Sequence, residues 1–221
     1  DVNGSEMVVW GGSDGLTELD TGGRYDPATD SWLATSVAAG VPSARQNASA
    51  VWSGSEVIVW GGWDLNETAT GGRYDPLTDS WRPTATGGNC PAARYDHTAV
   101  ATGSGMVVWG GSAGATGGRY DPASDSWQPV STVNAPPSPI GQTAIWTGTE
   151  MVAWGGSTLN TGGRYDPLAD SWMPTSTSGP VPQGRSNHVA VWAGSRMIVW
   201  GGNASNTELD SGGRYDPVTD T

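Results

Sequence analysis

The sequence predicts an all-β fold of the propeller class, in which small antiparallel sheets stand as blades around an axis. Three observations support this prediction. One unit is written about five times along the 221 residues, each unit is a series of short apolar segments, and no segment has the apolar spacing of an amphipathic helix. Gly, Pro, Ser and Asp join the segments and set the turns between them.

Tryptophan marks the repeated unit. In every copy a Trp precedes Gly-Gly, and these residues are Trp10, Trp60, Trp109, Trp154 and Trp200. The string Gly-Gly-Arg-Tyr-Asp-Pro follows in every copy, and it begins at Gly22, Gly71, Gly117, Gly162 and Gly212. Four copies continue with Asp-Ser-Trp. Of the 13 Trp residues, only Trp63 lies outside the repeated positions.

Each complete unit is predicted to form four strands, which we name a to d. Strand a ends in Ala-Val-Trp or a close variant, and strand b contains Met-Val-Val-Trp or a close variant. Strand c is the Gly-Gly-Arg-Tyr-Asp segment, and strand d begins at Ser-Trp. Strand b is apolar without alternation, which predicts burial of both its faces. A sheet that is buried on both faces needs another sheet on each side, and radial repetition provides this arrangement.

These motifs resemble the kelch repeat family. The Gly pair at 61–62 closes strand b, residues 74–76 supply Tyr-Asp-Pro in strand c, and Trp81 opens strand d. The pattern covers nearly the whole chain. The resemblance implies a propeller in which each repeat forms one blade, with strand a lining the central channel and strand d at the outside.

The whole chain is read as a single kelch-type propeller region, 1–221, whose repeats span about 1–40, 41–88, 89–134, 135–180 and 181–221. The first repeat lacks strand a and the last lacks strand d. The resemblance implies closed rings of six or seven blades. We therefore expect an arc, an incomplete part of a larger propeller, with further blades from the same or another chain.

Residues that recur in every copy are expected to serve the fold. The Tyr and Trp rings should fill the wedges between blades, and the paired Asp residues of each c–d turn, such as Asp26 and Asp30, should cap backbone N–H groups. One Arg recurs in each strand c, where a structural ion pair or stacking on an aromatic ring is expected. These residues are Arg24, Arg73, Arg119, Arg164 and Arg214.

The composition favours a non-catalytic protein without a cofactor or a metal site. The formal net charge of −12 argues against nucleic acid and anionic membranes as partners, and one Cys excludes an internal disulfide. No phosphate loop, nucleophile elbow or zinc-protease motif is present.

One enzymatic alternative is a copper oxidase similar to galactose oxidase, which would draw on Cys90, Tyr95, His97 and His188. Both His residues, however, belong to a repeated Arg-x-x-His pattern at the start of strand a. We therefore expect them to hydrogen-bond a neighbouring blade rather than to bind metal.

Recognition is predicted on the face that carries the b–c and d–a loops, because these loops vary between copies while the a–b and c–d turns do not. Trp63 is the residue there that the repeat does not require, and its polar neighbours suit a protein hot spot or a sugar. Carboxylates make the same face acidic. The predicted binding residues are Trp63, Asp64, Asn66, Glu67, Asp14, Glu18, Asp20, Glu208 and Asp210.

The function predicted on this basis is a binding or assembly scaffold whose partner is a protein or a glycan. The alternative is a carbohydrate-binding or sugar-modifying propeller.

The chain has neither Lys nor Phe, which fits a GC-rich bacterial gene, and Trp- and Gly-rich kelch repeats resemble those of bacterial extracellular proteins. We therefore expect an extracellular or periplasmic location.

Overall fold

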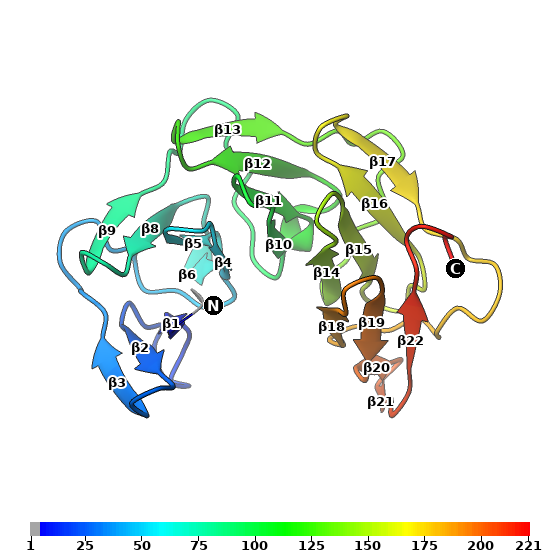
Figure 1. Cartoon of the computed structure of the whole chain (residues 1–221), viewed down its shortest axis with the longest axis horizontal. Helices are drawn as coiled ribbons and strands as arrows, with labels where there is room; N and C mark the ends of the chain where they lie inside the picture. Colours follow the sequence, from blue (N-terminus) through cyan, green and yellow to red (C-terminus); the bar gives the residue numbers. More distant parts are fainter. Residues whose placement is uncertain (1–4) are drawn as a thin grey trace.

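The computed structural model describes residues 5–221 and confirms the all-β fold. Five small antiparallel sheets follow one another in chain order as the blades of a five-bladed propeller arrangement, and the blades form an open arc (Figure 1). The described residues contain no helix that is long and apolar enough to cross a membrane.

The three central blades each have four strands in the order a, b, c, d. Each strand pairs antiparallel with the next along the chain, so a blade is a simple meander. The second blade comprises β4 (Ser49–Trp52), β5 (Val57–Trp60), β8 (Gly71–Asp75) and β9 (Ser80–Pro83). The third comprises β10 (Thr98–Ala101), β11 (Met106–Trp109), β12 (Gly117–Asp121) and β13 (Ser126–Pro129). The fourth comprises β14 (Gln142–Trp146), β15 (Met151–Gly155), β16 (Gly162–Asp166) and β17 (Ser171–Pro174).

Within residues 5–221 the first and last blades are three-stranded. The first contains strands b, c and d, which are β1 (Met7–Trp10), β2 (Gly22–Asp26) and β3 (Ser31–Ala34). The fifth contains strands a, b and c, which are β18 (Val189–Trp192), β19 (Met197–Trp200) and β22 (Gly212–Tyr215). These two blades stand at the two ends of the arc (Figure 1).

Two short hairpins and one helical turn lie within the b–c loops, and the sequence pattern does not predict them. The hairpins are β6 (Trp63–Asp64) with β7 (Asn66–Glu67), and β20 (Asn203–Ala204) with β21 (Thr207–Glu208). The 3-10 turn η1 spans Gly111–Ala113. Two residues are too few to show an alternating pattern, which is why the sequence does not reveal these strands.

The hydrophobic core lies in the wedges between adjacent blades. At one wedge Trp60 of strand b packs against Trp127 of the next blade's strand d, with ring centroids 5.0 Å apart. Tyr120 of strand c lies 4.9 Å from the same Trp127 ring. The predicted burial of strand b on both faces is confirmed in the central blades, where every residue of β5, β11 and β15 is buried.

The Arg of strand c links each blade to the next through a backbone carbonyl. Arg24 Nη1 donates to the oxygen of Pro76 at 2.6 Å, and Arg73 Nη1 donates to the oxygen of Pro122 at 2.6 Å. The expected ion pairs exist only as longer contacts, such as Arg73 to Glu56 at 3.9 Å. The main partner of this Arg is thus a proline carbonyl, which side-chain identity in the sequence does not reveal.

The two His residues hydrogen-bond the preceding blade, as expected. His97 Nε2 lies 2.8 Å from Ser49 Oγ, and His188 Nε2 lies 2.7 Å from Thr143 Oγ1. Gln142 occupies the same position in the fourth blade and donates to Thr98 Oγ1 at 3.4 Å. The position therefore joins neighbouring inner strands to each other.

Candidate functional site

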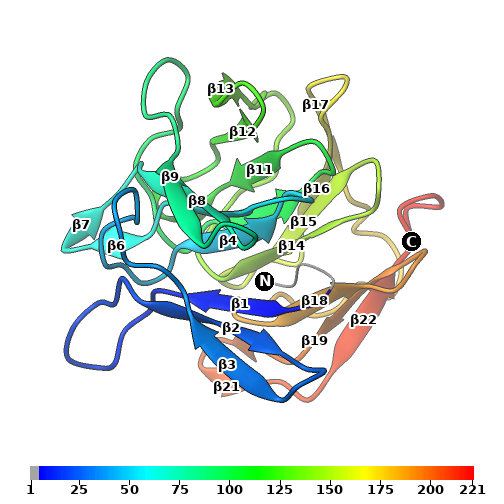
Figure 2. The ribbon, with the colours of Figure 1, turned by 60° about the vertical axis from the view of Figure 1, so that its left-hand side comes forward.

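The b–c loops and the d–a segments form one continuous surface, which we call the rim. It comprises residues 11–21, 61–70, 110–116, 156–161 and 201–211 of the b–c loops and residues 35–48, 84–97, 130–141 and 175–188 of the d–a segments. Backbone hydrogen bonds join the two sets, for example from Gly12 N–H to the carbonyl of Arg45 and from Gly62 N–H to the carbonyl of Arg94, both at 2.8 Å. Hairpin β6–β7 and the β1–β2 loop project on the same side of the molecule (Figure 2).

Buried Arg side chains hold the rim from beneath. Arg45, Arg94 and Arg185 are each only 1% exposed. Arg94 Nη1 donates to the carbonyls of Gly110 at 3.0 Å and Thr116 at 2.6 Å, which are the two ends of one b–c loop. Arg45 and Arg185 make the equivalent bonds in the second and fifth blades. Each Arg therefore clamps the base of its own blade's b–c loop.

The acceptors of these guanidinium groups are neutral oxygens. Arg94 donates to carbonyls and to Thr116 Oγ1, and burial lowers its pKa to about 10, so it remains charged at neutral pH. The fourth blade has Pro139 where the others have Arg, and there Gln142 Nε2 donates to Ser138 Oγ at 2.8 Å instead. Three of the rim's loops are thus fixed before any partner binds.

Trp63 lies in hairpin β6–β7 and is partly covered by the neighbouring blade. Its ring meets Tyr95 edge-on, with centroids 5.5 Å apart and an angle of 82° between the planes. Its backbone exchanges hydrogen bonds with Gln46, at 2.8 Å and 3.1 Å. Trp63 is therefore half-buried and helps to set the hairpin. Exposed surface is offered instead by the hairpin tip, where Leu65 is 76% exposed beside Asn66.

The remaining predicted residues of this hairpin lie around its turn. Asp64 pairs with Asn66, and Trp63 pairs with Glu67, in the two-residue ladder. Asp64 is half-buried, whereas Asn66 and Glu67 are exposed. The carboxylate of Glu67 and the amide of Asn66 are therefore available to a partner.

The b–c loop of the first blade lies beside this hairpin. Asp14 Oδ1 accepts hydrogen bonds from the N–H groups of Leu16 and Thr17, at 2.8 Å and 2.9 Å, and these bonds lower the pKa of Asp14. Glu18 is half-buried and accepts a bond from Gln46 Nε2 at 3.3 Å, while Asp20 is exposed. Because Gln46 also binds Trp63, it connects the loops of the first two blades.

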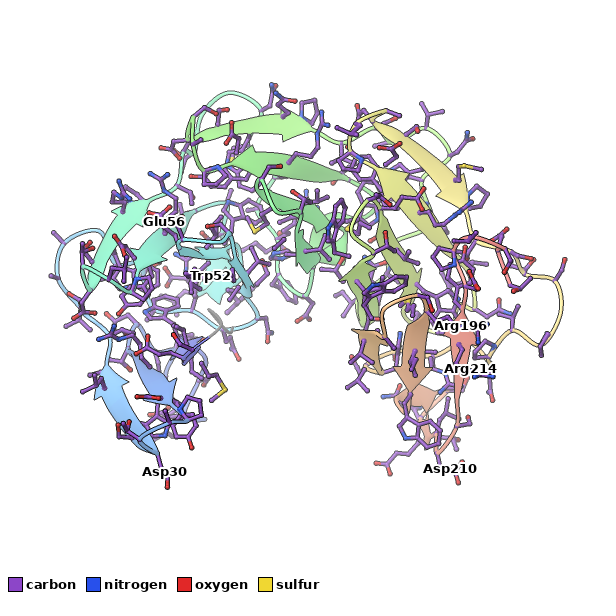
Figure 3. All side chains as sticks on the ribbon, in the orientation of Figure 1. Asp30, Trp52, Glu56, Arg196, Asp210 and Arg214 are labelled. Carbon is purple, nitrogen blue, oxygen red and sulfur yellow. The ribbon has the colours of Figure 1, made fainter. Side chains whose placement is uncertain are left out.

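Glu208 and Asp210 lie apart from the other predicted residues. Both are exposed and belong to the b–c loop of the fifth blade, at the opposite end of the arc, where Figure 3 labels Asp210. Glu208 pairs across hairpin β20–β21 with Asn203. The structure thus divides the nine predicted residues into a contiguous group on the first two blades and a separate pair on the fifth.

Sequence reasoning missed two kinds of rim residue. Gln46 and Tyr95 position the predicted residues, and both follow directly after the Arg that begins the Arg-x-x-His register. Leu16 and Leu65 are exposed apolar tips, at 91% and 76%. A comparison of the loops between copies would have found the two leucines, since they stand among polar residues at the centres of the first and second b–c loops.

The groups with redox or metal-binding chemistry have structural partners. Burial, together with Arg94, lowers the pKa of His97 to about 3, and burial with Arg185 lowers that of His188 to about 4. Burial raises the pKa of Cys90, whose thiol donates to the carbonyl of Ala69. Within residues 5–221, no group of three or more His, Cys, Asp or Glu side chains is placed to hold a metal ion.

A comparison with protein families agrees with this architecture. The KLHDC2/KLHL20/DRC7 Kelch-repeats domain matches residues 1–202 of the chain. The chain belongs to this kelch family. Kelch propellers of this type typically bind proteins and are usually non-catalytic. No curated protein matches the chain.

Proposed function

We propose that this kelch propeller is a non-catalytic scaffold that binds a protein partner through its rim, with the contact centred on the loops of the first and second blades. The observation that carries the proposal is the contrast between the variable loop sequences and their fixed bases. Arg45 and Arg94 clamp loops whose exposed residues differ from copy to copy. A rigid base with a variable surface lowers the entropic cost of binding.

The chemistry of this surface favours a basic protein surface as the partner. Asp14, Asp20 and Glu67 are exposed carboxylates, and Leu16 and Leu65 stand among them as exposed apolar side chains. Apolar anchors supply most of the binding energy in protein interfaces, and surrounding charges set specificity and association rate. A cationic surface with apolar pockets would complement both features.

The opposite face supports the proposal by contrast. Its c–d turns have nearly the same sequence in each copy, and their Asp side chains are committed to the turn itself. Asp75 Oδ1, for example, accepts from Leu77 N–H at 2.8 Å, and Asp79 Oδ1 accepts from Tyr74 OH at 2.6 Å. Turns that repeat almost unchanged from copy to copy are poor candidates for selective recognition.

The test uses two exposed leucines of the same blade that lie on opposite faces. Peptides selected from a phage-displayed random library against the wild-type protein are measured against Leu65→Ala, in the rim, and Leu77→Ala, in the c–d turn. We expect Leu65→Ala to weaken binding roughly tenfold and Leu77→Ala to leave it unchanged. Loss of affinity in Leu77→Ala with no effect of Leu65→Ala would contradict the proposal.

A glycan array tests the carbohydrate alternative, for which Trp63 is the aromatic side chain among the nine predicted binding residues. Sugar binding that disappears in Trp63→Ala would replace the protein scaffold with a lectin-like function. The half-buried ring, covered on one side by Tyr95, supports the protein partner instead.

The absence of Lys and Phe supports our further proposal that the protein works in the periplasm or outside a bacterial cell.

A further inference from the structure

A groove of about 740 Å³ lies between the third and fourth blades, on the face opposite the rim. The a–b turn and strand c of the third blade line one side of it, and the a–b and c–d turns of the fourth blade line the other. Both blades have all four strands and lie inside the arc, with a neighbouring blade on each side (Figure 1). The groove is therefore shaped by complete blades.

In three of the blades a carboxylate lies beside the Arg of strand c on this face. The carboxylate belongs to a Glu that ends the a–b turn, directly before strand b. The Arg side chains are largely buried, which strengthens the attraction between the opposite charges. The pairs are Arg24 with Glu6 and Arg73 with Glu56, both at 3.9 Å, and Arg164 with Glu150 at 3.8 Å.

The third blade lacks this carboxylate. Gly105 occupies the position that Glu56 has in the second blade. Arg119 Nη1 donates to the carbonyl of Pro167, and Arg119 Nη2 donates to Gln128 Oε1 at 3.0 Å, so both acceptors are neutral. Within residues 5–221 no carboxylate forms an ion pair with Arg119. The guanidinium group of Arg119 therefore lines the groove without a counter-charge.

The second blade shows how the same position looks when the carboxylate is present. Arg82 is the cross-strand neighbour of Arg73, as Gln128 is of Arg119, and it binds Glu56 at 2.6 Å. Glu56, which Figure 3 labels, and Arg82 line a smaller groove of about 410 Å³. In the third blade a Cβ at residue 105 would collide with the carbonyl oxygen of Tyr120, so the backbone there suits only Gly.

The acidic side chains that line the larger groove are already engaged. Asp121 and Asp166 each accept a backbone N–H of their own c–d turn, at 2.9 Å and 2.8 Å. Glu150 lies 3.8 Å from Arg164 in its own blade. The same turn carboxylates recur in the blades that have a Glu at this position, so they do not prevent a further carboxylate from lying beside the strand c Arg.

The fourth blade adds apolar surface to the groove. Trp146, at the end of strand a, is half-buried, and Leu168, in the c–d turn, is 98% exposed. The groove between the second and third blades lacks this surface, because Ala101 and Ala123 stand at the positions of Trp146 and Leu168. A positive charge beside apolar walls suits a ligand that combines a carboxylate with an apolar body.

We propose that the groove between the third and fourth blades binds a carboxylic acid with an apolar body. The carboxylate of the ligand lies beside Arg119, in the place that a Glu takes in other blades. Gln128 accepts from Arg119 through Oε1, which leaves its NH₂ group to donate to the ligand. The apolar body packs against Trp146 and Leu168. The site is separate from the rim and does not depend on the function proposed for it.

The test follows the side-chain Nε–H signals of the Arg residues by NMR while hydrocinnamate is added to the wild-type protein at constant ionic strength. We expect a saturable shift of the Arg119 signal and none of the Arg73 signal, because Arg73 already has Glu56. Propionate should bind roughly tenfold more weakly, since it lacks the phenyl group. The neutral amide of hydrocinnamate should not bind. An unmoved Arg119 signal, equal binding of acid and amide, or an equal shift at Arg73 would each overturn the proposal.

Two variants localise the site. Gln128→Glu is isosteric and exposed, and it places a carboxylate within reach of Arg119, so hydrocinnamate should bind roughly tenfold more weakly. Glu56→Gly is the matched change in the second blade and should make Arg73 respond to propionate, while the Arg119 signal of the same sample reports that the protein is folded. Unchanged affinity in the first variant, or an unresponsive Arg73 in the second, would contradict the role of the missing carboxylate.

The same measurement distinguishes two sources of the ligand. The carboxylate can belong to a free organic acid or to a Glu side chain beside an apolar residue of a polypeptide. N-acetyl-Glu-Phe-amide presents the second arrangement. Tighter binding of this peptide than of hydrocinnamate assigns the site to a polypeptide, and tighter binding of hydrocinnamate assigns it to a free acid. If neither compound moves the Arg119 signal, the proposal is wrong, whatever binds to the rim.

Discussion

The central blades and the end blades share one sequence pattern but differ in burial. Trp60 and Trp109 of the second and third blades are completely buried, whereas Trp200, at the same position of the fifth blade, is 57% exposed. The strand, the register and the following Gly-Gly are the same in all three copies. The difference therefore comes from the neighbour that each blade does or does not have. Stability in this protein belongs to the interfaces between blades.

The largest expected effect on the free energy of unfolding concerns Trp109 and Trp200, which occupy the same position in a central and an end blade. Trp109→Ala should lower the free energy of unfolding by ~3–5 kcal/mol, because it leaves a cavity against Trp172. Trp200→Ala, the matched control, should cost less than ~1 kcal/mol since the ring is largely exposed. Urea denaturation measures both. Equal costs would show that burial by the neighbouring blade does not decide stability.

The buried Arg clamps come next. Arg94→Met removes the charge-assisted donors of the Gly110 and Thr116 carbonyls, and we expect a loss of about 2–3 kcal/mol. Hydrogen exchange should accelerate first in the b–c loop, residues 110–116. The b–c loop of the fourth blade, residues 156–161, serves as the internal reference, because the sequence before that blade has Pro139 in place of the clamping Arg. Unchanged exchange in 110–116 would contradict the role of Arg94 as a clamp.

The His residues between blades predict a dependence on pH. The pKa of His97 is about 3 in the folded protein, below its usual value, so the unfolded chain binds the proton more tightly. Stability should therefore fall as the pH decreases from about 6.5, by at most about 1.4 kcal/mol per pH unit for this group.

His97→Gln is the direct check on this dependence. Gln142 already fills the equivalent position of the fourth blade, so the substitution keeps a donor to the neighbouring hydroxyl. Denaturation curves at several pH values between 7 and about 4 should show a flatter dependence in the variant. An identical dependence in both proteins would show that His97 is not responsible.

The smallest expected effect comes from a comparison of two strand c Arg residues, Arg119 of the third blade and Arg214 of the fifth. Arg119 Nη1 donates to the carbonyl of Pro167 in the next blade, and Arg119→Met should cost about 1–2 kcal/mol. Gly105 stands where the first, second and fourth copies have Glu, so no ion pair complicates this variant. Arg214→Met should be close to neutral. Equal shifts in melting temperature for the two variants would break the distinction between central and end blades.

Much of the fold follows from the sequence because each blade is a local meander. Strand order, turn positions and the incomplete first and last repeats all depend on residues close together in the chain. The rim was also predictable, since alternation of strand direction places b–c and d–a connections on one face. The hairpin of Trp63 was not, because its fixed position depends on Gln46 and Tyr95, which lie on the two flanking d–a segments.

By itself the sequence determined the repeat, the strands of each blade and the face on which copies differ. The tertiary structure decided which copies of an identical motif are buried, which carbonyl each strand c Arg binds, and that Trp63 supports the rim more than it projects from it. The physical reason is the same in each case. These contacts join residues of different copies, and copies with the same local sequence acquire different surroundings only when the blades pack together.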